Sequence, residues 1–156
     1  MKLSKATDYA LVMLAHLDTE GRDKWISVRQ VAEEVGISTQ FLSNIVHKLG
    51  KAGLVEALRG PKGGVRLAKN ANEITIGHVL IAMDDGLAVV DCLDRPGFCQ
   101  IENHCNVRKF WSITHELMFA ALKHISLKDI AMYLKTGSEH PKMKLKGELP
   151  HGHPLA

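Results

Sequence analysis

The sequence predicts a mainly α-helical fold with one small β-hairpin: a winged helix-turn-helix followed by a long helix. Two short amphipathic helical patterns are separated only by Gly36-Ile37, which is the tight junction of a helix-turn-helix. A Pro- and Gly-rich hairpin follows them directly, where a wing belongs. Towards the carboxyl end, a long helical pattern carries an apolar band that is wide for the terminal helix of a small domain.

Serine residues mark the starts of the first three helices. We expect these helices over about 4–19, 27–35 and 38–52, because a serine side chain accepts a hydrogen bond from the free N–H groups of a first turn. Gly36 is placed to end the second helix in a left-handed conformation. Apolar residues at helical spacing form the inner faces of the three helices: Tyr9, Ala10, Met13, Leu14, Leu17, Val28, Val31, Ala32, Val35, Leu42, Ile45, Val46 and Leu49.

Shorter elements follow. Strands over about 54–58 and 64–68 flank the hairpin tip Arg-Gly-Pro-Lys-Gly-Gly, and Thr75 can cap a short helix. Ser126 and Asp129 have the spacing of a capping box for the last helix. The expected division is a winged helix-turn-helix region over 1–88, a cysteine-rich loop over 89–106, a long and a terminal helix over 107–136, and a disordered tail over 137–156.

Composition sets limits on the class of protein. The chain has 156 residues and a net charge of +3, an excess too small to indicate a nucleic-acid partner unless the charge is local. No apolar run approaches the roughly 18 residues of a membrane-spanning helix, so we expect no membrane partner. The amino-terminal segment lacks the small-residue cleavage pattern of a signal peptide. We therefore expect a cytoplasmic protein, in which clustered cysteines favour metal or redox roles over structural disulfides.

The third helix and the hairpin carry a candidate DNA surface. The second helix of a helix-turn-helix enters the major groove, where short polar side chains can hydrogen-bond base edges. The hairpin tip adds positive charge at Arg59 and Lys62, with Arg66 just beyond. A merely solvated helix face and a protein-binding winged helix are the alternatives. The outward polar side chains expected on the third helix are Thr39, Gln40, Ser43, Asn44, His47 and Lys48.

All three cysteines of the chain lie in one short window, with the spacing Cys-x6-Cys-x5-Cys: Cys92, Cys99 and Cys105. Three thiolates suit an iron–sulfur cluster completed by a further ligand. A Cys3His zinc site that uses His104, a thiol–disulfide switch and unliganded thiols are the alternatives. No nucleophile–base pair is present, and Gly-Pro-Lys-Gly-Gly lacks the Lys-Ser/Thr of a phosphate-binding loop, so an enzyme is not expected.

Several of these stretches together resemble a known bacterial family. "TDYALVMLAHL", "GISTQFLSNIVHKLGKAGLVEALRGPKGGVRLAK" and the three-cysteine loop are similar to the winged-helix regulators that include the iron–sulfur cluster regulator IscR and the nitric-oxide-sensing repressor NsrR. The resemblance covers about residues 1–134. It implies a homodimer formed through the long helix and a cluster on the three cysteines, with 4Fe–4S favoured over 2Fe–2S.

The same resemblance implies a function and a fourth ligand. The function is a DNA-binding transcription regulator, with a repressor favoured, whose affinity for a double-stranded operator depends on a cluster that senses nitric oxide, iron or redox state. In the IscR branch a histidine follows the third cysteine by three residues, and Arg108 stands at that position here. The NsrR branch uses an acidic residue near the amino terminus of the partner subunit, which corresponds to Asp8. His104 is the local alternative. A thiol- or zinc-based redox regulator is the alternative function.

Overall fold

The computed structural model describes residues 3–60, 63–84 and 90–136, without the side chains of 133–136. The predicted fold class is confirmed, because the chain is mainly helical with one two-stranded antiparallel hairpin. No helix within the described ranges is long and apolar enough to cross a lipid bilayer. The elements follow in the order α1 (Lys5–Glu20), α2 (Val28–Val35), α3 (Thr39–Lys51), β1 (Val55–Leu58), β2 (Gly64–Leu67), α4 (Ile76–Ala82), α5 (Asp91–Asp94), η1 (Glu102–His104), α6 (Asn106–Lys123) and α7 (Leu127–Thr136).

The predicted helix starts are formed by side-chain caps. Ser4 Oγ accepts a hydrogen bond from the Thr7 N–H at 3.2 Å, and Ser38 Oγ caps α3 in the same way. Ser126 and Asp129 form the expected reciprocal box. Gly36 ends α2 with φ 76° and ψ 33°, a left-handed conformation that suits glycine and allows α3 to start three residues later, at Thr39.

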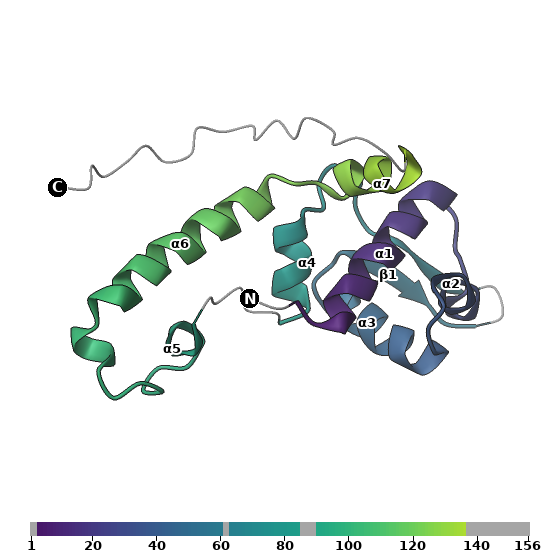
Figure 1. Ribbon diagram of the computed structural model, residues 1–156. Coiled ribbons are helices and arrows are strands. Elements are labelled where there is room, and N and C mark those ends of the chain that lie inside the picture. Colours follow the sequence, from purple (N-terminus) through teal and green to yellow (C-terminus); the bar gives the residue numbers. More distant parts are fainter. Residues whose placement is uncertain (1–2, 61–62, 85–89, 137–156) are drawn as a thin grey trace.

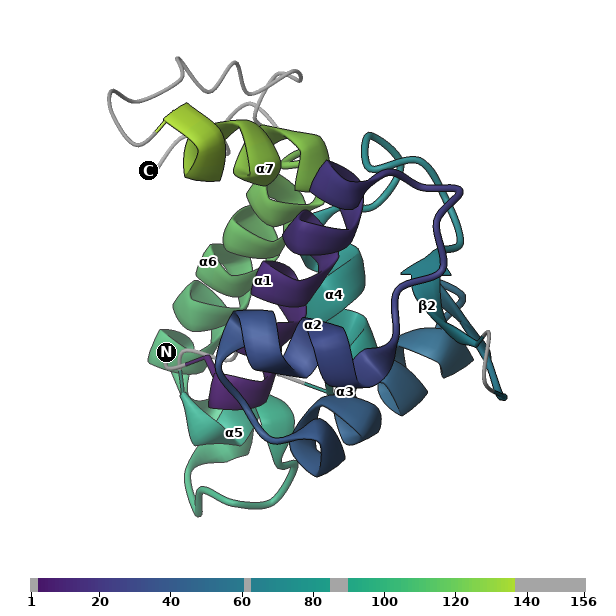
Figure 2. The same ribbon diagram turned by 90° about the vertical axis from the view of Figure 1, so that its right-hand side faces the viewer.

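The core of the winged helix-turn-helix is built around α1. This helix contacts α2, α3, α4, α7 and β2, and Figures 1 and 2 show it in the middle of that group. Burial of aliphatic side chains from all these elements supplies the main stabilising free energy. The largest fully buried side chains are Met13, Leu14, Leu17, Val31, Leu42, Ile45, Leu49, Val65, Ile74, Val79, Leu80 and Leu127.

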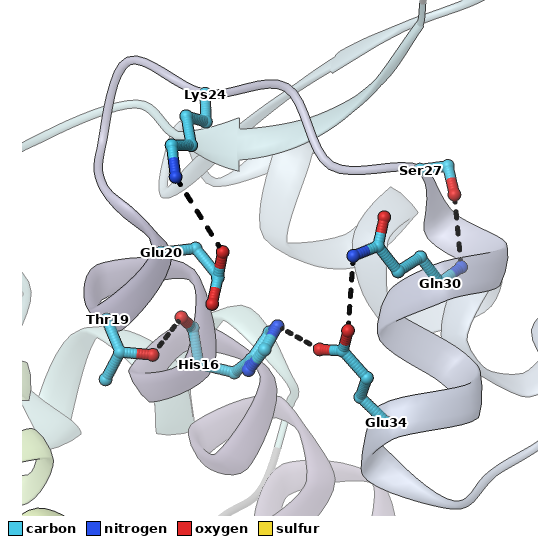
Figure 3. Close-up of polar contacts among 7 residues, drawn as sticks. All are labelled: His16, Thr19, Glu20, Lys24, Ser27, Gln30 and Glu34. Atoms are coloured by element: carbon cyan, nitrogen blue, oxygen red, sulfur yellow. Dashed lines mark hydrogen bonds and ion pairs between the residues drawn. The ribbon is translucent and has the colours of Figure 1, made fainter.

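A polar contact fixes α2 against α1 at the surface (Figure 3). His16 Nε2 of α1 lies 2.6 Å from Glu34 Oε2 of α2, although the two atoms do not have the alignment of a hydrogen bond. The other oxygen of Glu34 accepts a hydrogen bond from Gln30 Nε2 at 3.2 Å. The predicted capping box of α2 is therefore only half formed: Ser27 caps the Gln30 N–H, while the Gln30 side chain turns to Glu34.

The hairpin is joined to the rest of the chain by one further backbone pairing. Its register pairs Val55 with Leu67, and Val65 exchanges hydrogen bonds of 3.1 and 2.8 Å with Ile26. A Cβ at Gly64 would collide with the Ile26 carbonyl, so this close approach of two backbones requires glycine. The hairpin is thus held to the segment that leads into α2.

A short backbone ladder holds the end of α6 to the core. The Ile76 N–H donates to the Ile125 carbonyl at 2.9 Å, and the Leu127 N–H donates to the Ile74 carbonyl at 2.7 Å. Ile74 and Leu127 are fully buried. We call this pairing the clasp. Beyond it, α6 runs along α4 and then away from the winged helix-turn-helix, with α5 near its far end (Figure 1).

Gly77 allows α4 and α6 to approach closely, and this generates a stability prediction. A Cβ there would lie 2.9 Å from Lys123 Cγ and 3.3 Å from Lys123 Cα. At Gly50 on α3 the nearest atom would be at 3.9 Å, which is ordinary contact. Gly50→Ala should therefore raise the free energy of unfolding by about 0.4–1 kcal/mol. Gly77→Ala should lower the free energy of unfolding, because the new methyl group would collide with Lys123. Denaturant titration measures both. Equal gains would show that α4 and α6 do not touch in solution.

Candidate nucleic-acid interface and candidate metal loop

Helix α3 presents a polar face outward while its other face is anchored in the core. Leu42, Ile45, Val46 and Leu49 are buried, which fixes the rotation of the helix about its axis. The predicted polar residues of this helix are all exposed: Thr39, Gln40, Ser43, Asn44, His47 and Lys48. The structure therefore brings these six onto one solvent-facing surface that follows directly on the tight turn after α2.

Two of these residues already make contacts within the chain. Ser43 Oγ donates to the Thr39 carbonyl at 2.8 Å, which leaves its lone pairs as acceptors. Lys48 Nζ donates to the Met83 carbonyl at 3.2 Å and lies 3.3 Å from Asp84 Oδ2. Asp84 has φ 58°, a left-handed conformation that aspartate tolerates better than most residues. Lys48 thus connects α3 to the carboxyl end of α4.

The predicted basic residues of the hairpin have different environments. Arg59 is exposed at the end of β1, and Lys62 lies outside the described residues. Arg66 is held by two partners, since it forms a 2.8 Å ion pair with Glu56 and its guanidinium lies 4.5 Å from the centre of the Trp25 ring. Arg66 therefore stabilises the hairpin surface, and Arg59 is the described hairpin arginine that faces solvent without such a pair.

The cysteine segment contains two short helices within the predicted loop. Cys92 lies in α5, Cys99 lies between α5 and η1, and Cys105 directly precedes α6. All three are free thiols with intermediate burial. Soft thiols of this kind, none deep in the core, are chemically suited to an iron–sulfur cluster or zinc.

The other candidate ligands lie on separate elements. Asp8 is exposed on the first turn of α1, and His104 is exposed in η1. Among the described residues of this single chain, no three His, Cys, Asp or Glu side chains are gathered in the arrangement of a metal site. The three thiols are donors of the kind that an iron–sulfur cluster takes.

An ion pair organises the cysteine segment, and periodicity gave no signal for it. Arg108 of α6 lies 3.0 Å from Glu102 Oε1 and donates to the Cys92 carbonyl at 3.3 and 3.4 Å. The other oxygen of Glu102 accepts from the Gly97 N–H at 2.7 Å. Asp84 and Trp25 were likewise not predicted as partners of basic residues, because such pairs join side chains that are distant in sequence.

The outer side of α6 is apolar and exposed. None of its 18 residues is buried. Trp111 and Met118 are half-buried. The exposed apolar side chains of this helix, which we call the exposed stripe, are Val107 (60%), Phe110 (59%), Ile113 (59%) and Leu117 (37%).

Comparison with known proteins gives a consistent family match. The sequence profile Rrf2, described as an iron-dependent transcriptional regulator, matches residues 3–133. The chain is 36% identical over 136 residues to the HTH-type transcriptional regulator NsrR of Shouchella clausii, covering 85% of this chain and 89% of that protein. It is 30% identical over 130 residues to the HTH-type transcriptional regulator IscR of Yersinia pseudotuberculosis, covering 83% and 79%.

Solved structures show the same fold. CymR, the global cysteine regulator of B. subtilis, superposes with a TM-score of 0.67 at 23% identity, covering 85% of this chain and 98% of that chain. IscR of T. potens superposes with a TM-score of 0.69 at 21% identity, covering 90% and 93%. At these identities the likeness concerns the fold alone.

Proposed function

This chain belongs to the Rrf2 family of transcriptional regulators, and on that premise we propose a homodimeric DNA-binding repressor whose operator affinity depends on an iron–sulfur cluster. The observation that carries the DNA-binding part is the outward face of α3. Its polar side chains are exposed together while four aliphatic residues lock the helix to the core. A rigidly mounted polar helix beside a hairpin with an exposed arginine is the arrangement that reads a major groove.

The residues of this surface have separable roles. Gln40 and Asn44 can form bidentate hydrogen bonds with a base edge, which discriminates between sequences. Arg59 can neutralise a phosphate or enter the minor groove, which raises affinity for every sequence. Thr39, Ser43 and His47 complete the polar face, with Lys48 at its border and Lys62 outside the described residues.

We predict that Asn44→Ala and Gln40→Ala each reduce discrimination against mismatched operators by about 1–3 kcal/mol. Arg59→Ala should weaken binding to all duplexes and reduce the slope of log K against log salt by about 0.9. The operator would be selected from a random duplex library, and binding measured by fluorescence anisotropy in a salt series. Arg22→Ala is the matched control, because it also removes an arginine but lies outside α3 and the hairpin, in the segment after α1, where Arg22 donates a hydrogen bond to Asn70. If Asn44→Ala, Gln40→Ala and Arg59→Ala all bind like wild type, α3 and the hairpin are not the DNA surface.

A second copy of the chain is the proposed occupant of the exposed α6 stripe. An apolar stripe along an 18-residue helix is costly in water, and pairing two such helices would bury it. A two-fold dimer also gives two α3 helices, which can read half-sites about 34 Å apart. The dimer thus serves both the exposed stripe and the reading of a palindrome.

We predict that Ile113→Asp produces a folded monomer, because this side chain is largely exposed within the protomer but buried in the proposed interface. Burial of a side chain of this size contributes about 1.5–3 kcal/mol. Met118→Asp, by contrast, should also destabilise the protomer. Analytical ultracentrifugation measures the mass of each variant in solution. Circular dichroism measures its helix content. Lys109→Asp, on the polar side of α6, should leave the dimer intact. A monomeric wild type would contradict the proposal.

The cysteine segment is the proposed sensor. Cys92, Cys99 and Cys105 would supply three thiolates, and a cluster would supply an iron that nitric oxide, oxygen or a chelator can attack. We propose Asp8 of the partner subunit as the fourth ligand, since a carboxylate is a hard and exchangeable ligand. A ligand donated across the dimer would link cluster state to the spacing of the two α3 helices, and a 4Fe–4S cluster is favoured over 2Fe–2S.

We predict that the anaerobically purified protein is brown with stoichiometric iron and sulfide, and that Cys99→Ala loses both while remaining dimeric. Asp8→Ala should keep a cluster but change its absorption spectrum and its rate of reaction with nitric oxide. His104→Ala should change neither. Zinc without sulfide in fresh wild-type protein would contradict the cluster. Loss of the cluster in His104→Ala, with no effect of Asp8→Ala, would assign the fourth ligand to His104 instead.

A further inference from the structure

We propose that Arg108 is a positioning residue that, together with Glu102, holds the cysteine segment in one arrangement against the first turn of α6. The proposal deepens the proposed function and rests on it where the cluster is concerned. Arg108 is the third residue of α6, so its backbone is fixed by the helix. Its guanidinium contacts both the Cys92 carbonyl and the Glu102 carboxylate. A planar guanidinium can serve two acceptors at once, whereas it cannot act as a metal ligand.

The contacts reach each part of the segment close to a cysteine. Arg108 binds the carbonyl of Cys92 itself. Glu102 binds the Gly97 N–H, two residues before Cys99, and Glu102 lies three residues before Cys105. One arginine–glutamate pair therefore connects α5, the turn at Gly97 and η1 to the first turn of α6.

This pair differs from an ordinary surface salt bridge. An isolated exposed pair contributes little, because water screens it and two long side chains must be ordered. Here the side chain of Glu102 is only 13% exposed and that of Arg108 34% exposed. Each side chain also makes charge-assisted hydrogen bonds with backbone groups, which strengthens the network. Removing either partner leaves the other with unmatched charge beside the thiols.

The position of the pair has an electrostatic consequence. A cluster held by thiolates is negatively charged, and charges and hydrogen bonds around the sulfurs set its reduction potential. Loss of Arg108 would leave the Glu102 carboxylate unpaired and lower that potential. Loss of the Glu102 charge would leave a free guanidinium and raise it. A purely structural role of the pair would not shift the potential in opposite directions.

The test uses the full-length dimer in apo and reconstituted forms. Variants are Arg108→Ala, Arg108→Lys and Glu102→Gln, with Lys109→Ala as the control one residue along α6. In the apo protein, the rate of thiol modification by a disulfide reagent should rise about tenfold in Arg108→Ala and Glu102→Gln, without loss of helix content. Arg108→Lys should be intermediate, because an ammonium can pair with Glu102 without also holding the Cys92 carbonyl.

In protein reconstituted with ferrous iron and sulfide, chelator-driven cluster loss should be about tenfold faster in Arg108→Ala. The reduction potential should fall in Arg108→Ala and rise in Glu102→Gln. Apo thiol rates equal to those of Lys109→Ala, or potential shifts of the same sign, would overturn the proposal. If wild type assembles no cluster, the proposed function fails but the apo thiol rates still decide the role of Arg108. If Arg108→Ala does not fold, the apo thiol rates of Arg108→Lys and Glu102→Gln, each compared with Lys109→Ala, decide the proposal.

Discussion

The placement of α6 and α7 depends on the clasp between residues 74–76 and 125–127. Its backbone hydrogen bonds are short, and Ile74 and Leu127 bury it in the core formed around α1. Because α6 has no fully buried residue, apolar burial within the protomer constrains its direction only weakly. The clasp and the close approach at Gly77 supply that constraint. The ion pair of Lys128 with Asp18, at 3.3 Å, then fastens α7 to α1.

The local elements could be predicted because their signals are local. Caps such as Ser4, Ser38 and the Ser126/Asp129 box depend on residues three apart, and core faces follow helical spacing. The fold class follows from their order. The breadth of the apolar band on α6 was also visible in the sequence. The sequence did not indicate which side of that band remains exposed, because this depends on where α4 packs against α6.

The polar contacts around the candidate sites could not be predicted from the sequence. Arg108 with Glu102 and Cys92, Lys48 with Asp84, and Arg66 with Glu56 and Trp25 each join groups brought together by tertiary structure. A charged residue at an exposed helical position has the same pattern whether it is solvated or paired. The short helices α5 and η1 were missed because four- and three-residue helices lack a full period of apolar residues. The roles proposed for the DNA-binding and metal-binding residues remain predictions.

The contact between Lys48 and Asp84 means that this lysine carries a counterion supplied by the protein. Most lysines that reach a DNA phosphate do so with a gain in entropy, because cations condensed on the DNA are released into solution. A DNA phosphate that binds Lys48 would also have to displace the Asp84 carboxylate. That carboxylate would then lie unpaired beside the negatively charged duplex. This exchange would take place at the carboxyl end of α4, where Lys48 also donates to the Met83 carbonyl. If Lys48 binds a DNA phosphate as proposed, DNA binding and the Lys48–Asp84 contact would be thermodynamically linked, and each would oppose the other by the same free energy.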